Sequence, residues 1–293
     1  MKITLPDNSS RELPEGSSGY DLAKDIGPGL AKSAIAVTID GVQRDLHDVI
    51  DADASVSIIT IDSDEGIEIM RHTLTAQVLA RAIKNLYPKS KLAIGPTVQD
   101  GFYYDVESEE SISSDDLSKI EEEMKKIIKT KSAITKKLVS KKEALKIFKS
   151  NKEPYKEIII NESDQDDNFQ LYYQDDEEFV DLCRGPHLPN LGFIGSFKLT
   201  KVSGAYWKGD SKNSMLTRIY GTAFNNDKDL QNHLDNIEEA LKRDHRKLGK
   251  EMDLFHFQDE APGMVFWHPY GWNIYKTLQN FMRNKLDKNG YLE

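Results

Sequence analysis

Cysteine is almost absent from this sequence: Cys183 is the only one in 293 residues. A single cysteine cannot form an internal disulfide or a cysteine-rich zinc site, which is typical of proteins from a reducing compartment. Any metal site would need histidines and carboxylates as ligands. A disulfide scaffold and a cysteine-rich zinc module are therefore excluded.

Long hydrophobic runs are also missing. No segment approaches the ~18 consecutive apolar residues of a membrane helix, and the initial MKITLP has no apolar stretch behind its charge. The sequence thus predicts neither a membrane span nor a signal peptide, and a cytoplasmic protein is expected. With 38% hydrophobic residues over 293 positions, the chain is long enough for two or three folded domains.

The chain has no overall excess of basic charge. A formal net charge of -10 argues against a general coat for nucleic acids, which needs clustered lysine and arginine. Locally the order reverses, because acids dominate residues 105–123 and lysines recur through residues 125–152. This basic stretch is either the solvated surface of ordinary helices or a face for a polyanion, and composition leaves both open.

The surroundings of the cysteine are the first sign of chemistry. It lies in the sequence DLCRGPH, where Gly185 and Pro186 exclude a regular helix. Cys183 and His187 therefore share a tight loop that can aim both side chains into one pocket, together with Asp181. On this string alone, an equally good interpretation is a small buried thiol and a loop histidine with satisfied hydrogen bonds.

The first 62 residues predict a small α+β roll, because short strand-like segments flank one helix. A polar break at residues 62–66 is expected to end this unit. The predicted strands are 2–5, 10–13, 34–39, 42–46 and 55–61, and the predicted helix is 19–26.

A second α+β unit is predicted after the break. Apolar residues recur at helical spacing over residues 67–86, and Tyr87-Pro88 ends that helix. Residues 227–252 are predicted to form one long charged helix that leads into a third unit. The other predicted elements are strands at 92–98, 101–106, 169–173, 192–202 and 215–223, and helices at 114–129 and 141–148.

Five separate strings, in the correct order, resemble threonyl-tRNA synthetase, a class II aminoacyl-tRNA synthetase. The resemblance covers essentially the whole chain. The strings are LPDNS at 5–9 with GLAK at 29–32, IGP at 94–96 with GFYYD at 101–105, CRGPH at 183–187, RIYGTA at 218–223, and HRKLG at 245–249 leading to GMVFWH at 263–268.

The resemblance implies an α+β multidomain chain. It assigns a TGS domain of ubiquitin-like β-grasp fold to residues 1–62, an α+β editing domain of the threonyl/alanyl-tRNA synthetase type to 63–225, a linker helix to 226–252, and the truncated beginning of a class II core to 253–293. The complete enzymes are ATP-dependent homodimers that attach threonine to tRNA(Thr) with Mg and one Zn. Those cofactor sites are expected beyond residue 293, so we expect no metal bound to this chain and no threonine-dependent ATP–pyrophosphate exchange.

The need for an editing site follows from the substrates. Serine keeps the hydroxyl of threonine and lacks one methyl, which is worth only about 1–3 kcal/mol of discrimination. A second pocket that admits serine and excludes threonine can hydrolyse the mischarged Ser-tRNA(Thr). Such hydrolysis requires a positioned water, a proton acceptor and donors that face the carbonyl oxygen.

The resemblance also assigns residues to this pocket. Cys183 and His187 would form its floor, Asp181 would recognise the amino group, Lys156 would orient water or the terminal ribose, and Tyr104 would line the adenosine. Gly95, Pro96 and Gly185 complete the implied substrate-binding set. Taken alone, Tyr104 would more often be a core residue and Lys156 one of many lysines.

The helix at 67–86 departs from the family's Arg-His-x-x-x-His pattern. Aligned without a gap on the following Tyr87-Pro88, the two histidine positions fall on Thr73 and Gln77, and His72 lies one residue, about 100°, from the expected face. Glutamine cannot exchange a proton near pH 7. A local shift where the helix begins could still bring His72 to the pocket, but no residue replaces the second imidazole. We therefore expect serine editing to be weakened or lost; the alternative is that Cys183, His187, Lys156 and Asp181 suffice.

Two other functions remain open, a free-standing trans-editing hydrolase and a TGS-containing RNA-binding regulatory protein. Residues 253–293 argue against both, because neither would need the beginning of a class II core. In the synthetase context, the lysine-rich stretch at 125–152 acquires a specific possible partner, the acceptor arm of tRNA(Thr).

Overall fold

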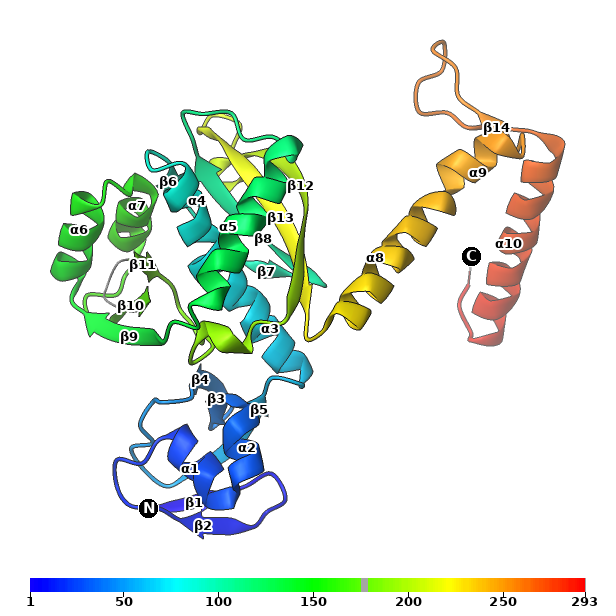
Figure 1. Cartoon of the computed structure of the whole chain (residues 1–293). Helices are drawn as coiled ribbons and strands as arrows, with labels where there is room; N and C mark the ends of the chain where they lie inside the picture. The colour runs from blue at the N-terminus through cyan, green and yellow to red at the C-terminus, as the bar shows by residue number, and fades with distance from the viewer. Residues whose placement is uncertain (175–178, 293) are drawn as a thin grey trace. The chain divides into compact units, whose positions relative to one another are not determined.

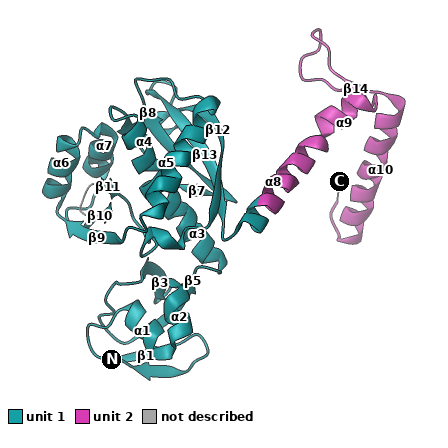
Figure 2. Ribbon diagram, in the orientation of Figure 1, with its two compact units in different colours: residues 1–230 teal, residues 231–293 magenta. Residues whose placement is uncertain are grey.

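The computed structural model describes residues 1–174 and 179–292 (Figure 1). It contains two compact units, Met1–Leu230 and Gln231–Glu293, shown in different colours in Figure 2. Helices and sheets alternate along the chain, which confirms the predicted α+β class. No helix within the described residues is long and apolar enough to cross a membrane.

The first unit begins with a mixed five-stranded sheet in the order β2-β1-β5-β3-β4. Strands β1 and β5 are parallel, and the other pairs are antiparallel. Apolar side chains from the sheet, among them Ile3, Val37 and Val56, pack with Leu22 of the first helix. The strands are β1 (Lys2–Thr4), β2 (Ser10–Glu12), β3 (Ala34–Ile39), β4 (Val42–Asp45) and β5 (Ala54–Thr60).

Two helices accompany this sheet, α1 (Gly19–Ile26) and α2 (Pro28–Ser33). Helix α1 starts with a capping box between Ser18 and Asp21, which satisfies its first N–H groups. Helix α2 was not predicted, because the helix expected at 19–26 is followed by Gly27-Pro28-Gly29, which is typical of a helix end. Pro28 instead occupies the first turn of a new helix, where its missing N–H costs nothing.

The second part of this unit contains two antiparallel sheets. One has the order β12-β13-β8-β6, with β7 paired to β8; the other has the order β11-β10-β9. Three helices, α3 (Asp64–Thr73), α4 (Ala80–Leu86) and α5 (Leu117–Lys129), share one large apolar core with the first of these sheets. The strands are β6 (Lys91–Leu92), β7 (Thr97–Val98), β8 (Gly101–Glu107), β9 (Ile134–Val139), β10 (Phe169–Gln174), β11 (Phe179–Leu182), β12 (Ser196–Tyr206) and β13 (Met215–Phe224).

The predicted helix at 67–86 is present but is not regular. It consists of α3 (Asp64–Thr73), a π-helical segment η1 (Leu74–Leu79) and α4 (Ala80–Leu86). At the end of η1, the Ala80 N–H reaches back five residues to the carbonyl of Thr75. A π turn holds one residue more than an α turn. Side chains before it therefore point in other directions than they would in a continuous α-helix through α4.

Helices and short 3₁₀ turns complete the unit. Helix α7 was not predicted, nor were strands β9 and β11. Pro154 starts α7 in the first-turn position that proline favours. The elements are η2 (Ser114–Asp116), α5 (Leu117–Lys129), α6 (Lys141–Ser150), α7 (Pro154–Glu162), η4 (Leu191–Phe193) and η5 (Trp207–Gly209).

The predicted single helix at 227–252 is wrong, because two helices occupy it, α8 (Asp227–Lys242) and α9 (His245–Glu251). The side chain of Asp244 accepts a hydrogen bond from the Arg246 N–H at 2.8 Å, so it caps a new helix where the charged pattern alone suggested continuation. The hairpin β14 (Phe255–His256) and β15 (Phe266–Trp267) and helix α10 (Pro269–Lys288) follow.

Candidate active site

A pocket of about 610 Å³ lies beside the loop that follows β11. Its walls come from the α3–η1 helix, the segment before β8, helix α7 and the cysteine loop. Among the predicted site residues, those that line it are His72, Gly95, Pro96, Lys156, Asp181 and Cys183. The others, Thr73, Gln77, Tyr104, Gly185 and His187, are not among its lining residues.

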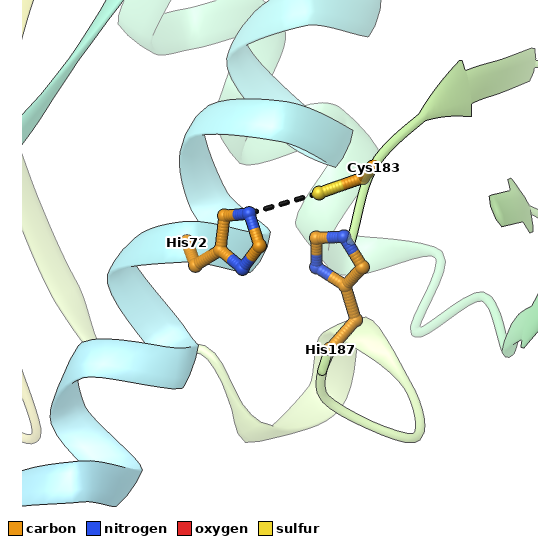
Figure 3. Close-up of side chains that lie close together, drawn as sticks. All are labelled: His72, Cys183 and His187. Atoms are coloured by element: carbon orange, nitrogen blue, oxygen red, sulfur yellow. Dashed lines mark hydrogen bonds between the residues drawn. The ribbon is translucent and has the colours of Figure 1, made fainter. Parts of the chain in front are cut away.

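The closest reactive contact joins an imidazole to the thiol. His72 Nε2 lies 2.9 Å from Cys183 Sγ (Figure 3). The other ring nitrogen, Nδ1, lies 3.3 Å from the carbonyl oxygen of Pro186. Because a carbonyl only accepts, Nδ1 carries the proton and Nε2 offers its lone pair to the thiol. Burial lowers the pKa of His72, which favours this neutral form.

His187 lies against the same histidine. The two imidazole rings stack with their centroids 4.5 Å apart and 25° between their planes. Figure 3 shows both rings beside the thiol. His187 Nδ1 is 3.1 Å from Thr73 Oγ1, which also accepts the Leu188 N–H at 3.0 Å. The buried Nε2 of His187 has no hydrogen-bond partner among the described residues. Buried polar atoms without a hydrogen-bond partner are rare in folded proteins, so this nitrogen is a candidate functional group.

His72 reaches the pocket, which is the alternative that the sequence left open beside an offset of about 100° from the expected face. That offset assumed a regular α-helix between His72 and Tyr87. The π-helical segment takes up one surplus residue, and this turns His72 toward Cys183. Thr73, to which the ungapped alignment assigned the first histidine, instead holds the His187 ring.

Gln77 does not replace an imidazole in the pocket. It is fully buried, and Gln174 Nε2 donates to its carbonyl oxygen at 2.5 Å and lies 3.2 Å from its Oε1. Ala76, the preceding residue, lines the pocket instead. The helix therefore supplies one titratable side chain to the pocket, His72.

A buried ion pair also lies at the wall of the pocket. Lys156 Nζ lies 2.5 Å from Asp181 Oδ1, and the two side chains are only 4% and 2% exposed. Asp181 also accepts hydrogen bonds from the Leu182 N–H at 2.8 Å and from the Tyr104 hydroxyl at 3.2 Å. Three donors thus compensate the buried carboxylate, as burial of a charge requires.

Helix α7 places Lys156 at this point. Glu153, just before the helix, is buried and accepts the Leu92 N–H at 2.6 Å and the Lys84 ammonium at 2.7 Å. These contacts fasten the start of α7 to strand β6 beside the pocket. Desolvation raises the pKa of Glu153, and the two donors oppose that shift.

Tyr104 lies behind the pocket and is fully buried. Burial, with Asp181 beside the hydroxyl, raises its pKa well above the usual value, so the hydroxyl stays protonated and donates. A Cβ atom on Gly95 would lie 2.3 Å from the Tyr104 ring, so the glycine backbone packs directly on it. The expected contact of Tyr104 with an adenosine stays a prediction.

One group of three potential metal ligands occurs in the described part of the chain: His72, Cys183 and His187, with ligand atoms within 4.8 Å of one another. Two imidazoles and a thiolate form a donor set that zinc accepts. From usual zinc–ligand bond lengths, a tetrahedral ion holds sulfur and nitrogen about 3.5 Å apart. The 2.9 Å contact between Cys183 and His72 is shorter, so the geometry favours a direct hydrogen bond.

Sequence reasoning missed several residues at the site. Arg184 is exposed and lines the pocket, although the motif gave it no role. The Tyr172 and His187 rings pack edge to face, with centroids 4.4 Å apart. Asp45 lies 142 positions before His187 yet accepts its backbone N–H at 2.8 Å. No local pattern signals a contact over such a separation.

The lysine-rich stretch at 125–152 runs from helix α5 to the end of α6. Most of its lysines are exposed. Lys136 is not available to a polyanion, because its ammonium lies 2.8 Å from Asp45 and 2.5 Å from Asp48. Lys141 donates to the carbonyl of Ser163 at 2.7 Å. A basic face here must therefore rest on the other lysines.

The lowered pKa of His72 gives a testable pH dependence of stability. Below the ordinary histidine pKa of about 6.5, His72 binds a proton in the unfolded chain but stays neutral in the folded one, where burial lowers its pKa. The free energy of unfolding therefore falls as the pH falls. We expect the urea midpoint of unfolding to drop between about pH 7.5 and about pH 5.5, and His72→Gln to reduce that drop. The exposed His47→Gln serves as control; an equal drop in all three proteins would contradict the assignment.

Comparisons with known proteins agree with this architecture. The TGS domain family matches residues 1–60, and the family described as threonyl and alanyl tRNA synthetase second additional domain matches residues 170–220. Similar curated proteins include the threonine--tRNA ligases of Hahella chejuensis and Prochlorococcus marinus. Each is 50% identical over 291 residues, covering 99% of this chain and 45% of the relative. The chain thus spans less than half the length of these relatives.

Proposed function

We propose that this chain supplies the hydrolytic editing site of a threonine--tRNA ligase. The support is its similarity to such ligases and its matches to the TGS and second additional domain families. The substrate would be the ester of serine with tRNA(Thr), and the products free serine and tRNA. The observation that carries the proposal is the contact of a neutral imidazole with the Cys183 thiol at the wall of a pocket that the buried Lys156 also lines.

The geometry supports water attack on the ester. His72 offers the Nε2 lone pair, which would accept a proton from the attacking water, directly or through the thiol. The same proton would then pass to the ribose oxygen as the ester bond breaks. Lys156 would stabilise the negative charge that develops on the carbonyl oxygen, because its ammonium has N–H groups besides the one directed at Asp181.

The complete protein is proposed to be an ATP-dependent threonine--tRNA ligase of cytoplasmic protein synthesis. Residues 253–293 would begin its class II catalytic domain, and residues 226–252 would link that domain to the editing part. Its ATP, Mg and Zn sites and its homodimer contacts would lie beyond residue 293. The support is the identity to threonine--tRNA ligases along nearly the whole chain.

Deacylation of Ser-tRNA(Thr) by residues 1–293 tests the editing proposal. We expect hydrolysis well above the spontaneous rate, slower hydrolysis of Thr-tRNA(Thr), and a loss of about 100-fold in His72→Ala or Cys183→Ala, because proton transfer contributes at least this factor. The exposed Lys24→Ala, which lies outside the lysine-rich stretch at 125–152, is the control. Hydrolysis no faster than in buffer would refute the proposal.

The rate of the unmodified chain also bears on the expectation of weakened editing. That expectation rested on the absence of two imidazoles, but the structure retains one of them in the pocket, on His72. Gln77 still leaves the helix without a second. Weakened editing therefore stays a prediction, which a rate close to spontaneous hydrolysis would favour.

A further inference from the structure

An acidic side chain of the TGS region lies under the candidate active site. Asp45, the last residue of β4, is about 15% exposed, and its two carboxylate oxygens contact different elements of the second part of the unit. Oδ1 accepts the backbone N–H of His187 at 2.8 Å, and Oδ2 accepts the hydroxyl of Tyr172 at 2.8 Å. One carboxylate thus connects the cysteine loop with strand β10.

Both contacts determine where the His187 ring lies. The backbone contact fixes the position of the loop. The Tyr172 contact fixes a buried ring that packs edge to face with the imidazole at 77°. Gly185 leaves no spare room, since a Cβ atom there would lie 1.9 Å from the Tyr172 hydroxyl. Two contacts therefore hold His187, one at its backbone N–H from Asp45 and one at its ring from Tyr172.

The His187 ring in turn stacks on His72, which contacts the thiol. A continuous series of contacts joins Asp45 through His187 and His72 to Cys183, with no intervening solvent-exposed group. Lys136, paired to the same carboxylate at 2.8 Å, neutralises its charge and fixes its orientation. Hydrogen bonds to an ionised carboxylate are stronger than neutral ones, so Asp45 holds its partners firmly.

We propose that Asp45 of the TGS region is a positioning residue for the hydrolytic site: it holds the His187 loop so that the stacked histidines aim His72 Nε2 at Cys183. The expected effect of Asp45 on catalysis rests on the proposed function. Its effect on the positions of His187 and His72 does not. On this view the TGS region is a structural component of the site. Misplacement of a catalytic group by about 1 Å costs up to 100-fold in rate.

Asp45→Ala tests the proposal with two independent readouts. We expect kcat for Ser-tRNA(Thr) deacylation to fall about 10- to 100-fold with KM little changed, because the base is misaligned while the pocket remains. Cys183 is the only cysteine, so iodoacetamide modifies one site. Its alkylation should slow about 3-fold or more, because His72 no longer takes up the thiol proton.

Asp48→Asn is the matched control. Asp48 also pairs with Lys136 but contacts neither His187 nor Tyr172, so both rates should stay at the wild-type value.

Should Asp45→Ala fail to fold, as judged by circular dichroism, Tyr172→Phe removes only the hydroxyl contact and should slow alkylation by a smaller factor. If Asp45→Ala folds and is alkylated at the wild-type rate, the proposal is overturned. If Asp45→Ala does not fold, a wild-type alkylation rate in Tyr172→Phe overturns it. The alkylation result stands even if the chain proves inactive in deacylation, so failure of the proposed function remains distinguishable.

Discussion

Replacing Lys156 with methionine is expected to destabilise the first unit by about 3–5 kcal/mol, the usual cost of leaving one partner of a buried ion pair without the other. Asp181 would keep the N–H of Leu182 and the hydroxyl of Tyr104 as donors, but neither carries a positive charge. Urea unfolding monitored by circular dichroism would measure the loss. Deacylation should fall as well, because a buried ammonium is removed from the pocket wall.

Two further variants separate this effect from a general cost of losing a lysine. Lys89→Met breaks an ion pair with Glu109 whose side chains are 79% and 70% exposed, so it should change stability by about 1 kcal/mol or less. Adding Asp181→Asn to Lys156→Met removes the unpaired charge and should recover much of the stability. If Lys156→Met unfolds at the same urea concentration as Lys89→Met, the Lys156–Asp181 ion pair does not stabilise the fold as a buried pair would.

Gly185→Ala is expected to cost about 3 kcal/mol or more and to abolish deacylation. The glycine has a φ of +65°, which by itself costs an L-residue roughly 1–2 kcal/mol. The added Cβ atom would also lie 1.9 Å from the buried hydroxyl of Tyr172, so the tyrosine or the loop must move. Either movement breaks the contact with Asp45 and displaces His187. Unfolding in urea and the deacylation rate would both report the change.

Gly209→Ala provides the matched comparison. Its φ is +73°, and nothing lies within 4 Å of the Cβ position, so the backbone cost of about 1–2 kcal/mol should act alone. The difference between the two variants measures the effect of crowding against Tyr172. Equal losses in both would show that the cysteine loop tolerates the extra methyl group.

The predictable parts of the molecule were those with short-range patterns. Alternating apolar residues located most strands, and Tyr87-Pro88 located the end of a helix. The cysteine motif and Lys156 were expected in one pocket, and the structure places Cys183, Lys156 and Asp181 on its walls. Their catalytic roles remain proposals.

Two kinds of feature could not be predicted. The π-helical segment leaves no trace in the periodicity, because all six of its residues are buried and apolar positions occur on every side. Helix α7 combines a starting proline with three consecutive isoleucines, which does not give an amphipathic pattern. Contacts such as Asp45 to His187 depend on how the first sheet packs against the cysteine loop, which no local string encodes.

The π turn also affects how this helix can change in evolution. Because a surplus residue is stored as a wider turn, one residue between His72 and Tyr87 can be gained or lost while both ends keep their direction. Counting back from Tyr87-Pro88 then assigns the wrong identity to every position before the wide turn. In relatives of different helix length, the histidine equivalent to His72 is the one that faces the cysteine, and an apparent loss of that histidine can be a one-residue insertion.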